Sequence, residues 1–386
     1  MSDLPRELIY AIVDAIVSPL DLSADPWIVD NASEYLTTLR ACSLVAHDFV
    51  RPCQHYIFHG VTIGEDASRL ATIVNQSPHI AGYIKALYIE SALKDGNGVL
   101  VRQLLTLTTG LERLDIYPVP NGARWAAEYM AVFGDLALDS LHHLTLWYFT
   151  FDNATQLENL LSKNSGLRTL VLRSVTLMDT SISQTNGETE PLVTLERLDL
   201  YFLDAANVAA LVGAFQRVDL GKLKSLYLHN TPMSSLIELN TSTLEDLRIR
   251  AYFPDTFLNQ SVDADALVDA SQLQTLDLKI PFLSSLTQMV RRFGPLTNLV
   301  QLHTIVLSVS QKTTPAEWTA LDQLLGVVAG DLPGLKHVRV YSGSQWNSQE
   351  PHPEGQIRQW MPVLAARGVL RLMGHDTTEG DEFAGI

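Results

Sequence analysis

The chain has 386 residues, a formal net charge of −16, 46% hydrophobic residues and 18% charged residues. This composition is typical of a folded protein and excludes a largely disordered chain. The acidic excess argues against nucleic acid and against an anionic membrane surface as partners, because both require clustered Lys and Arg. No uninterrupted apolar run reaches the length of a membrane span, so we also expect no membrane partner. The two cysteines, Cys42 and Cys53, are too few for the cysteine-rich caps of extracellular repeat proteins, so we expect a cytoplasmic or nuclear protein.

The first sixty residues are predicted to form a small all-α domain. Pro5 suits the first turn of a helix, where its missing N–H is harmless. The residues that follow place apolar side chains at helical spacing: Leu8, Ile9, Ile12, Val13 and Ile16. A second helix is expected from about Glu34 to Ala41, and a third over 44–50, ending near Pro52. The segment 60–63 is strand-like.

From residue 84 onward the chain repeats one pattern, apolar-x-x-apolar-x-apolar. Its first anchors are Ile84, Leu111, Leu141, Leu167, Leu195, Leu223, Leu244, Leu273, Leu302 and Leu335. The spacings between them are 27, 30, 26, 28, 28, 21, 29, 29 and 33 residues. The core of each pattern alternates like a half-buried strand, and segments such as 153–163, 205–217 and 284–293 have helical periodicity. No asparagine follows the anchors at the position where many such repeats carry one.

Strand and helix alternating at this period match a leucine-rich-repeat solenoid. The predicted fold is therefore α/β, with a parallel sheet on the concave face, helices outside, and a small all-α domain in front. The predicted domains are 1–60 for the helical domain, 61–374 for the solenoid and 375–386 for a flexible tail. A last helix over 353–367 and an edge strand over 368–373 are expected to close the solenoid.

The N-terminal segment also resembles an F-box. The resemblance is carried by Leu4-Pro5-x-Glu7-Leu8-Ile9, then Leu39-x-x-Cys42-Ser43-Leu44-Val45-x-x-x-Phe49-x-Arg51, then Tyr56-Ile57-Phe58. With the repeats, the chain resembles the F-box and leucine-rich-repeat proteins abundant in mushroom-forming fungi. It departs from them in the long interval between the first two helices and in Phe49, where the family usually has Trp.

This resemblance implies the substrate-recognition subunit of a Skp–cullin–F-box ubiquitin ligase, with no catalytic activity of its own. The helical domain would bind a Skp-family adaptor, and a cullin through it. The implied adaptor-binding residues are Leu4, Pro5, Leu8, Ile9, Ile12, Leu44 and Val45. Two alternatives stay open. The same side chains could form a cap over the first repeat, and the chain could be a repeat scaffold or inhibitor-type binding protein without a ligase role.

An unknown protein substrate is expected to bind the concave face. Strand residues between and just after the anchors should point away from the core, and aromatic residues and Arg are enriched at binding hot spots. The candidate substrate-binding residues are Tyr117, Trp147, Arg173, Tyr201, Tyr227, Arg248, Arg250 and Tyr341. Arg248 and Arg250 share a face and could bind a phosphate or carboxylate. Alanine at Tyr201 and Tyr227 should weaken partner capture with little loss of melting temperature, unless these rings simply fill the sheet surface.

The sequence provides no motif for catalysis, for a cofactor or for a metal. Cys42, His47, Cys53, His55 and His59 lie close together, but their spacing matches no zinc motif. No nucleophile elbow, phosphate loop or carboxylate pair is recognisable. We therefore expect a non-enzymatic binding protein without cofactors, although catalytic groups can also converge from distant parts of a sequence.

Overall fold

The computed structural model describes residues 4–18, 32–64, 67–90, 97–117, 132–133, 137–179, 193–214, 218–231, 242–251, 270–280, 282–292, 299–309, 313–332, 334–342 and 354–373. The statements below concern these residues. The chain divides into two compact units, of which the first runs to Tyr148 and the second begins at Phe149. This division falls within the repeats, whereas the sequence places its domain boundary near residue 60. The predicted tail over 375–386 lies outside the described residues.

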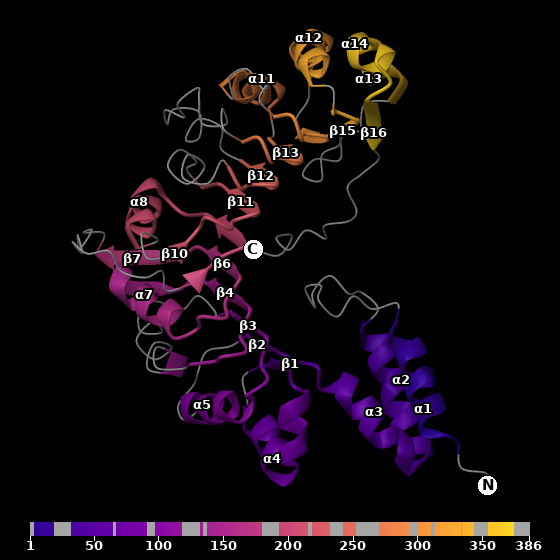
Figure 1. Ribbon diagram of the computed structural model, residues 1–386, viewed down its shortest axis with the longest axis vertical. Helices are drawn as coiled ribbons and strands as arrows, with labels where there is room; N and C mark the ends of the chain where they lie inside the picture. Colours follow the sequence, from indigo (N-terminus) through magenta and orange to yellow (C-terminus); the bar gives the residue numbers. More distant parts are fainter. Residues whose placement is uncertain are drawn as a thin grey trace. The chain divides into compact units, whose positions relative to one another are not determined.

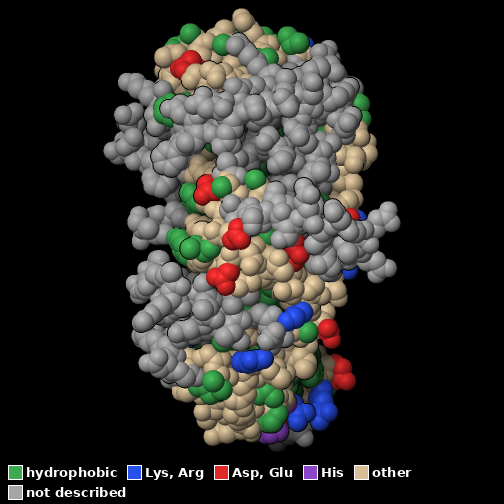
Figure 2. Space-filling model, turned by 90° about the vertical axis from the view of Figure 1, so that its left-hand side faces the viewer, with side chains coloured by type: hydrophobic (Ala, Val, Ile, Leu, Met, Phe, Trp, Pro, Cys, Tyr) green, Lys and Arg blue, Asp and Glu red, His purple; other side chains and the backbone are tan. Residues whose placement is uncertain are grey.

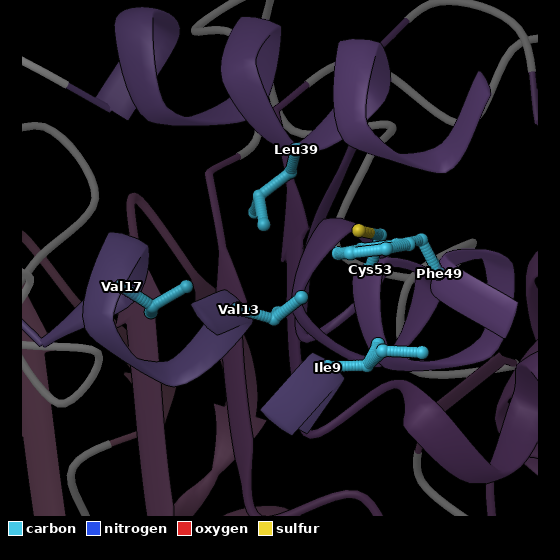
Figure 3. Close-up of a cluster of buried hydrophobic side chains, with 6 residues drawn as sticks. All are labelled: Ile9, Val13, Val17, Leu39, Phe49 and Cys53. Carbon is cyan, nitrogen blue, oxygen red and sulfur yellow. The ribbon is translucent and has the colours of Figure 1, made fainter. Parts of the chain in front are cut away.

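Three helices form a bundle at the start of the first unit (Figure 1). They are α1 (Arg6–Val17), α2 (Ala32–Val45) and α3 (His47–Ile57). Their shared core consists of six buried side chains that point toward one another in Figure 3: Ile9, Val13, Val17, Leu39, Phe49 and Cys53. The spacing of four residues between Ile9, Val13 and Val17 puts them on one side of α1, so this helix buries a single stripe.

The second and third helices are longer than expected. Leu44 and Val45 end α2 and do not begin the third helix. Helix α3 continues through Pro52 to Ile57, although proline removes one backbone hydrogen bond. The residues after Pro52 pack on the core, with Cys53 buried and with Tyr56 and Ile57 partly buried against it. This packing stabilises the last turns of α3, whereas local sequence preference alone would end the helix at Pro52.

The repeats form one parallel sheet of 12 strands in the order β1-β2-β3-β4-β6-β9-β11-β12-β13-β14-β15-β16. Their bounds are β1 (Gly60–Ile63), β2 (Ala86–Ile89), β3 (Arg113–Ile116), β4 (His143–Trp147), β6 (Thr169–Arg173), β9 (Arg197–Tyr201), β11 (Ser225–His229), β12 (Asp246–Arg250), β13 (Thr275–Lys279), β14 (Thr304–Val309), β15 (His337–Ser342) and β16 (Leu370–Met373). The ten predicted repeat strands, the strand at 60–63 and the closing strand are thus all present.

The anchors explain why the strands align. Leu198 pairs with Leu226, and Leu226 pairs with Leu247, so equivalent anchors lie side by side. All three anchors of every repeat are buried, and the most accessible, Leu335, is 7% exposed. A one-residue slip would move a whole strand's anchors to the other face, so the pattern determines the register.

Helices connect the strands, and within each unit they lie on one side of the sheet (Figure 1). Their bounds are α4 (Ser68–Gln76), the 3-10 helix η1 (Pro78–Tyr83), α5 (Asn97–Leu107), α7 (Ala154–Ser162), α8 (Ala205–Ala214), α11 (Leu283–Arg292), α12 (Pro315–Asp331), α13 (Glu354–Trp360) and α14 (Pro362–Ala366). The helices predicted over 153–163, 205–217 and 284–293 are therefore confirmed. The single helix predicted over 353–367 is instead two, separated at Met361.

Four repeats turn a tight corner directly after their strand. Tyr148, Ser174, Phe202 and Asn230 have φ values of 50°, 49°, 55° and 47°, a left-handed conformation unusual for residues other than glycine. Backbone hydrogen bonds hold the corners in place: the N–H of Ser174 donates to the carbonyl of Tyr201 (2.8 Å), and that of Phe202 donates to the carbonyl of His229 (2.7 Å).

Each corner turns the following residue inward. Those residues are Phe149, Val175, Leu203 and Thr231, all buried. They occupy the position where an asparagine ladder would stand. The Thr231 hydroxyl oxygen lies 3.2 Å from the Leu200 carbonyl and 3.0 Å from the His229 carbonyl, and 3.4 Å from the Leu203 N–H. One buried hydroxyl thus satisfies corner groups of two repeats. Beyond the corners, two short parallel pairs form: β5 (Thr150–Asn153) with β7 (Thr176–Asp179), and β8 (Val193–Thr194) with β10 (Val218–Asp219).

Candidate interaction surfaces

The helical bundle exposes a second set of apolar side chains. Leu8 on α1 is 50% exposed, and Leu44 at the end of α2 is 86% exposed. The other exposed members of the predicted adaptor-binding set are Leu4, Pro5, Ile12 and Val45. On α1, Leu8 and Ile12 are four residues apart and so lie on one stripe beside the buried one, and Leu4 precedes the helix. These side chains are not used by the bundle's own core.

Ile9 is the exception in that set. Its side chain is 2% exposed and belongs to the core cluster with Val13 and Phe49 (Figure 3). The prediction that Ile9 contacts an adaptor is therefore corrected: Ile9 holds the helices together. The sequence did not distinguish Ile9 from Leu8 because both stripes of α1 are apolar. Successive residues are only 100° apart around the helix axis, so the two stripes lie next to each other.

The side of the sheet that carries no anchors is called here the anchor-free face. Each strand contributes three positions to it: the residue before the second anchor, the residue between the second and third anchors, and the residue after the third anchor. In the second unit the residues directly after the last anchor form one row across paired strands. From β6 to β15 this row is Arg173, Tyr201, His229, Arg250, Lys279, Ser308 and Tyr341. Four predicted substrate-binding residues share it, and His229 and Lys279 join them although they were not in the predicted set.

The anchor-free face is less exposed than the alternating pattern suggests. Tyr201 and Tyr227 are 7% and 6% exposed, and Arg173 is also buried. By contrast, Arg248 and Arg250 on β12 and Tyr341 on β15 are half-buried, as alternation predicts. The expectation that Tyr201 and Tyr227 present free rings is therefore wrong.

The cause is stacking between neighbouring strands. The Tyr201 and Tyr227 rings meet edge to face with centroids 4.8 Å apart, and they form a small buried cluster with Val171. The Arg173 guanidinium carbon lies 3.9 Å from the Tyr201 centroid, and that of Arg250 lies 5.3 Å from the Tyr227 centroid. Rings and guanidinium groups at this spacing attract each other and cover one another's surface.

Two arginines of this face bind aspartates on their own strands. Arg197 contacts both carboxylate oxygens of Asp199, from Nε at 3.0 and 3.1 Å and from Nη2 at 2.7 Å. The hydrogen bond and charge of Asp199 raise the pKa of Arg197. Arg248 donates from Nε to Asp246 Oδ2 at 3.0 Å. Arg248 therefore has a carboxylate partner on its own strand.

Positive charges on neighbouring parts of the sheet act on one buried histidine. His229 is 1% exposed, and its ring centroid lies 5.4 Å from that of Tyr201. Burial, followed by the charges of Arg250, Arg173 and Lys279, lowers the pKa of His229 to about 3. The ring is therefore neutral at physiological pH, and charges on three other strands, β6, β12 and β13, contribute to this.

The remaining predicted residues lie elsewhere on the sheet. In the first unit, Tyr117 and Trp147 are half-buried, with ring centroids 4.6 Å apart.

On the face of the molecule in Figure 2, described acidic and basic side chains both occur and neither sign forms a continuous patch. Within the described ranges, no three His, Cys, Asp or Glu side chains gather in a metal-binding arrangement. None of the described helices has the length and hydrophobicity to cross a bilayer.

The sequence matches no protein-family model, and no curated protein is significantly similar to it.

Proposed function

We propose that this chain is a substrate receptor of a Skp–cullin–F-box type ubiquitin ligase. The N-terminal helices bind a Skp-family adaptor, and the repeat sheet holds a protein substrate. The chain itself carries no transfer chemistry in this proposal. The F-box-like motif supports it, together with a solenoid-like α/β fold whose long parallel sheet is suited to binding macromolecules.

One observation carries the proposal. The bundle has two apolar stripes on α1, and its core uses only the stripe of Ile9, Val13 and Val17. Leu8 and Ile12 remain 50% and 42% exposed. Apolar side chains grouped on a helix and left in water commonly mark a protein interface. The rival interpretation, a helical cap over the first repeat, leaves this second stripe without a role.

The test is co-expression of the full chain with a Skp-family adaptor, followed by size-exclusion chromatography. The wild-type chain should co-elute with the adaptor. Leu8→Asp should abolish co-elution, because a carboxylate buried in an apolar interface is strongly unfavourable.

Tyr10→Asp is the matched control. Tyr10 is 51% exposed, almost the same as Leu8, and lies on the opposite flank of the buried stripe of α1. This variant should still co-elute. A well-folded wild-type chain that never co-elutes would refute the proposal and favour the alternative, a repeat scaffold without a ligase role. Equal loss of co-elution in both variants would point to damage of the helical bundle. Circular dichroism of the two variants would detect such damage as a loss of helix signal.

A further inference from the structure

Basic side chains along this sheet form ion pairs in a regular way. Some carboxylates lie two residues from their arginine on the same strand, and others occupy the equivalent position of the next repeat. The pairs are Arg113 with Asp115, Arg197 with Asp199, Arg248 with Asp246, Lys85 with Glu112, Arg168 with Glu196, and Lys224 with Glu245. At these repeats the sheet therefore supplies carboxylates for its own cations.

The end of the sheet departs from this arrangement (Figure 1). Lys336 directly precedes β15, Arg339 lies in β15 and Arg371 lies in β16, and these side chains are exposed. Strands β14, β15 and β16 contain no Asp or Glu. Among the described residues, no carboxylate forms an ion pair with any of these cations. The sheet thus ends in unneutralised positive charge, although the whole chain has a formal net charge of −16.

Two of these cations also face each other. Arg339 and Arg371 pair in register on neighbouring parallel strands, with their Cα atoms about 5 Å apart. Like charges at directly opposed positions of a sheet are unfavourable. The residues two positions from Arg339 are His337 and Tyr341, where arginines of other strands have an aspartate. The arrangement is therefore unfavourable in the free chain, and binding of anionic groups would relieve it.

Hydrogen bonds fix the position of the Arg371 guanidinium. Its Nη1 donates to the carbonyls of Gly368 (3.0 Å) and Leu370 (3.2 Å). The Val369 carbonyl between them accepts from the Val338 N–H of β15 (2.9 Å), and successive carbonyls of a strand point to opposite sides. The guanidinium therefore lies at the outer edge of β16, away from β15. No described residue accepts from its Nε or Nη2.

We propose that this end of the sheet binds an acidic segment of a protein partner through Lys336, Arg339 and Arg371, called here the end cations. Lys336 and Arg339 are about 10 Å apart along the chain, and Arg371 reaches the outer edge. Because these charges are spread out, carboxylates on several side chains of a segment meet them better than one compact anion. Carboxylates are also the partners of the equivalent cations in other repeats.

The exposure of the end cations favours a protein over a small molecule as the ligand. Sites for small molecules enclose most of the ligand surface, which exposed side chains on a strand do not. Arg371 already supplies a donor to two carbonyls of the outer edge. The segment is therefore recognised through its charges and is not added to the sheet as a further strand.

This inference deepens the proposed function and rests on it for the role of the segment as part of a substrate. It can fail separately: a chain that binds the adaptor but no acidic peptide would refute only the inference.

The test is a fluorescence-anisotropy titration of the full chain with a labelled peptide of alternating Glu and Ala, about eight residues long, which in extended form spans the end cations. The reference peptide has Gln in place of Glu. The Glu peptide should bind at least about ten-fold more tightly. Its affinity should fall with added salt because the attraction is screened. Equal binding of the two peptides would overturn the proposal.

Two further ligands separate the competing anions. A Gln and Ala peptide with a single phosphoserine and a single-stranded oligonucleotide should both bind more weakly than the Glu peptide. Tighter binding of the phosphoserine peptide would replace the acidic segment by a phosphate site. Tighter binding of the oligonucleotide would replace it by a nucleic-acid surface. Either result contradicts the proposal.

A pair of double variants locates the site. Arg339→Gln with Arg371→Gln should weaken Glu-peptide binding about ten-fold, equivalent to some 1.4 kcal/mol. Arg69→Gln with Arg102→Gln makes the same chemical change at exposed arginines of α4 and α5. These control substitutions should leave the affinity unchanged. An equal loss in both double variants would show a non-specific charge effect and contradict the proposed site.

A single variant separates binding from folding. Arg371 bonds to its own strand, so its replacement can destabilise β16. Arg339 has no side-chain hydrogen bond or ion pair with the described residues. Arg339→Gln should therefore melt at the wild-type temperature or above, because it removes one of two opposed like charges, and should bind the Glu peptide about three-fold more weakly. Unchanged affinity with an unchanged melting temperature would contradict the site.

Discussion

The guanidinium carbon of Arg173 lies 3.9 Å from the centroid of the Tyr201 ring, close enough for direct stacking. The contact continues to the next strands through Tyr227 and then Arg250, with 4.8 Å between the two tyrosine centroids. Side chains from β6, β9, β11 and β12 thus hold one another in place on the anchor-free face. These aromatic side chains contribute to the stability of the sheet, and the adjacent cations determine its charge.

Tyr201→Ala should lower the free energy of unfolding by about 3 kcal/mol, because it removes a buried ring and its contacts with Tyr227 and Arg173. Urea denaturation followed by circular dichroism measures the change. Tyr201→Phe keeps the ring and should lose less than half as much. An alanine variant with unchanged stability would restore the interpretation that this ring is presented to a partner.

His229 should make the stability depend on pH. Its pKa is about 3 in the folded protein because of burial and of Arg250, Arg173 and Lys279, whereas an unfolded histidine titrates near 6.5. Below about pH 6.5 the unfolded chain binds a proton that the folded chain does not. The free energy of unfolding should therefore decrease as the pH is lowered from about 6.5 to about 3.

The measurement compares the wild type with His229→Gln in urea at about pH 7.5 and about pH 5.5. Over this interval the wild type should lose about 1.4 kcal/mol more than the variant, because the variant lacks the titrating ring. The same pH dependence in both proteins would mean that His229 is protonated in the folded state or exposed.

Ser174 tests the left-handed corner after β6. With φ of 49°, this residue has a conformation that glycine adopts freely. Ser174→Gly should be neutral or raise the free energy of unfolding by up to about 1 kcal/mol, and Ser174→Val should lower it by about 2 kcal/mol. Thermal unfolding of the two variants provides the comparison. A valine variant as stable as the glycine variant would contradict the corner geometry.

Asp322 joins two C-terminal helices. Its carboxylate is fully buried on α12 and accepts hydrogen bonds from the N–H groups of Val363 (2.8 Å) and Leu364 (3.0 Å), at the start of α14. Asp322→Ala should lower the free energy of unfolding by about 3 kcal/mol, because it leaves two N–H groups without acceptors. Asp322→Asn keeps one acceptor and should lose about half as much. Identical losses in the two variants would show that packing, not these bonds, makes the contribution.

The sheet was predictable because its anchors recur with a strict local spacing. Leu198 and its equivalents specify both the strands and their register, and Asn153 correctly marked the start of α7 through its side-chain oxygen, which accepts from the Gln156 N–H. The helix ends were less predictable. Pro52 is a local signal to stop, but the packing of Cys53 in the bundle outweighs it. Likewise, the start of α14 depends on Asp322, some forty residues earlier in the chain.

The candidate surfaces were predictable only in part. Strand alternation correctly placed Arg250 on the anchor-free face, but it could not show that Tyr201 and Tyr227 bury each other, since that depends on which strands become neighbours. Lys279 and His229 occupy the same repeat position as Arg173 and Arg250. Comparing that one position across all repeats would have found both.

The most direct test of the account is the affinity of the full chain for a Skp-family adaptor, measured by isothermal titration calorimetry for the wild type, Leu8→Asp and Tyr10→Asp. The account predicts binding by the wild type, an unchanged dissociation constant for Tyr10→Asp and at least about a hundred-fold weaker binding for Leu8→Asp, equivalent to some 2.7 kcal/mol. A folded wild-type chain without measurable affinity, or three equal dissociation constants, would contradict it.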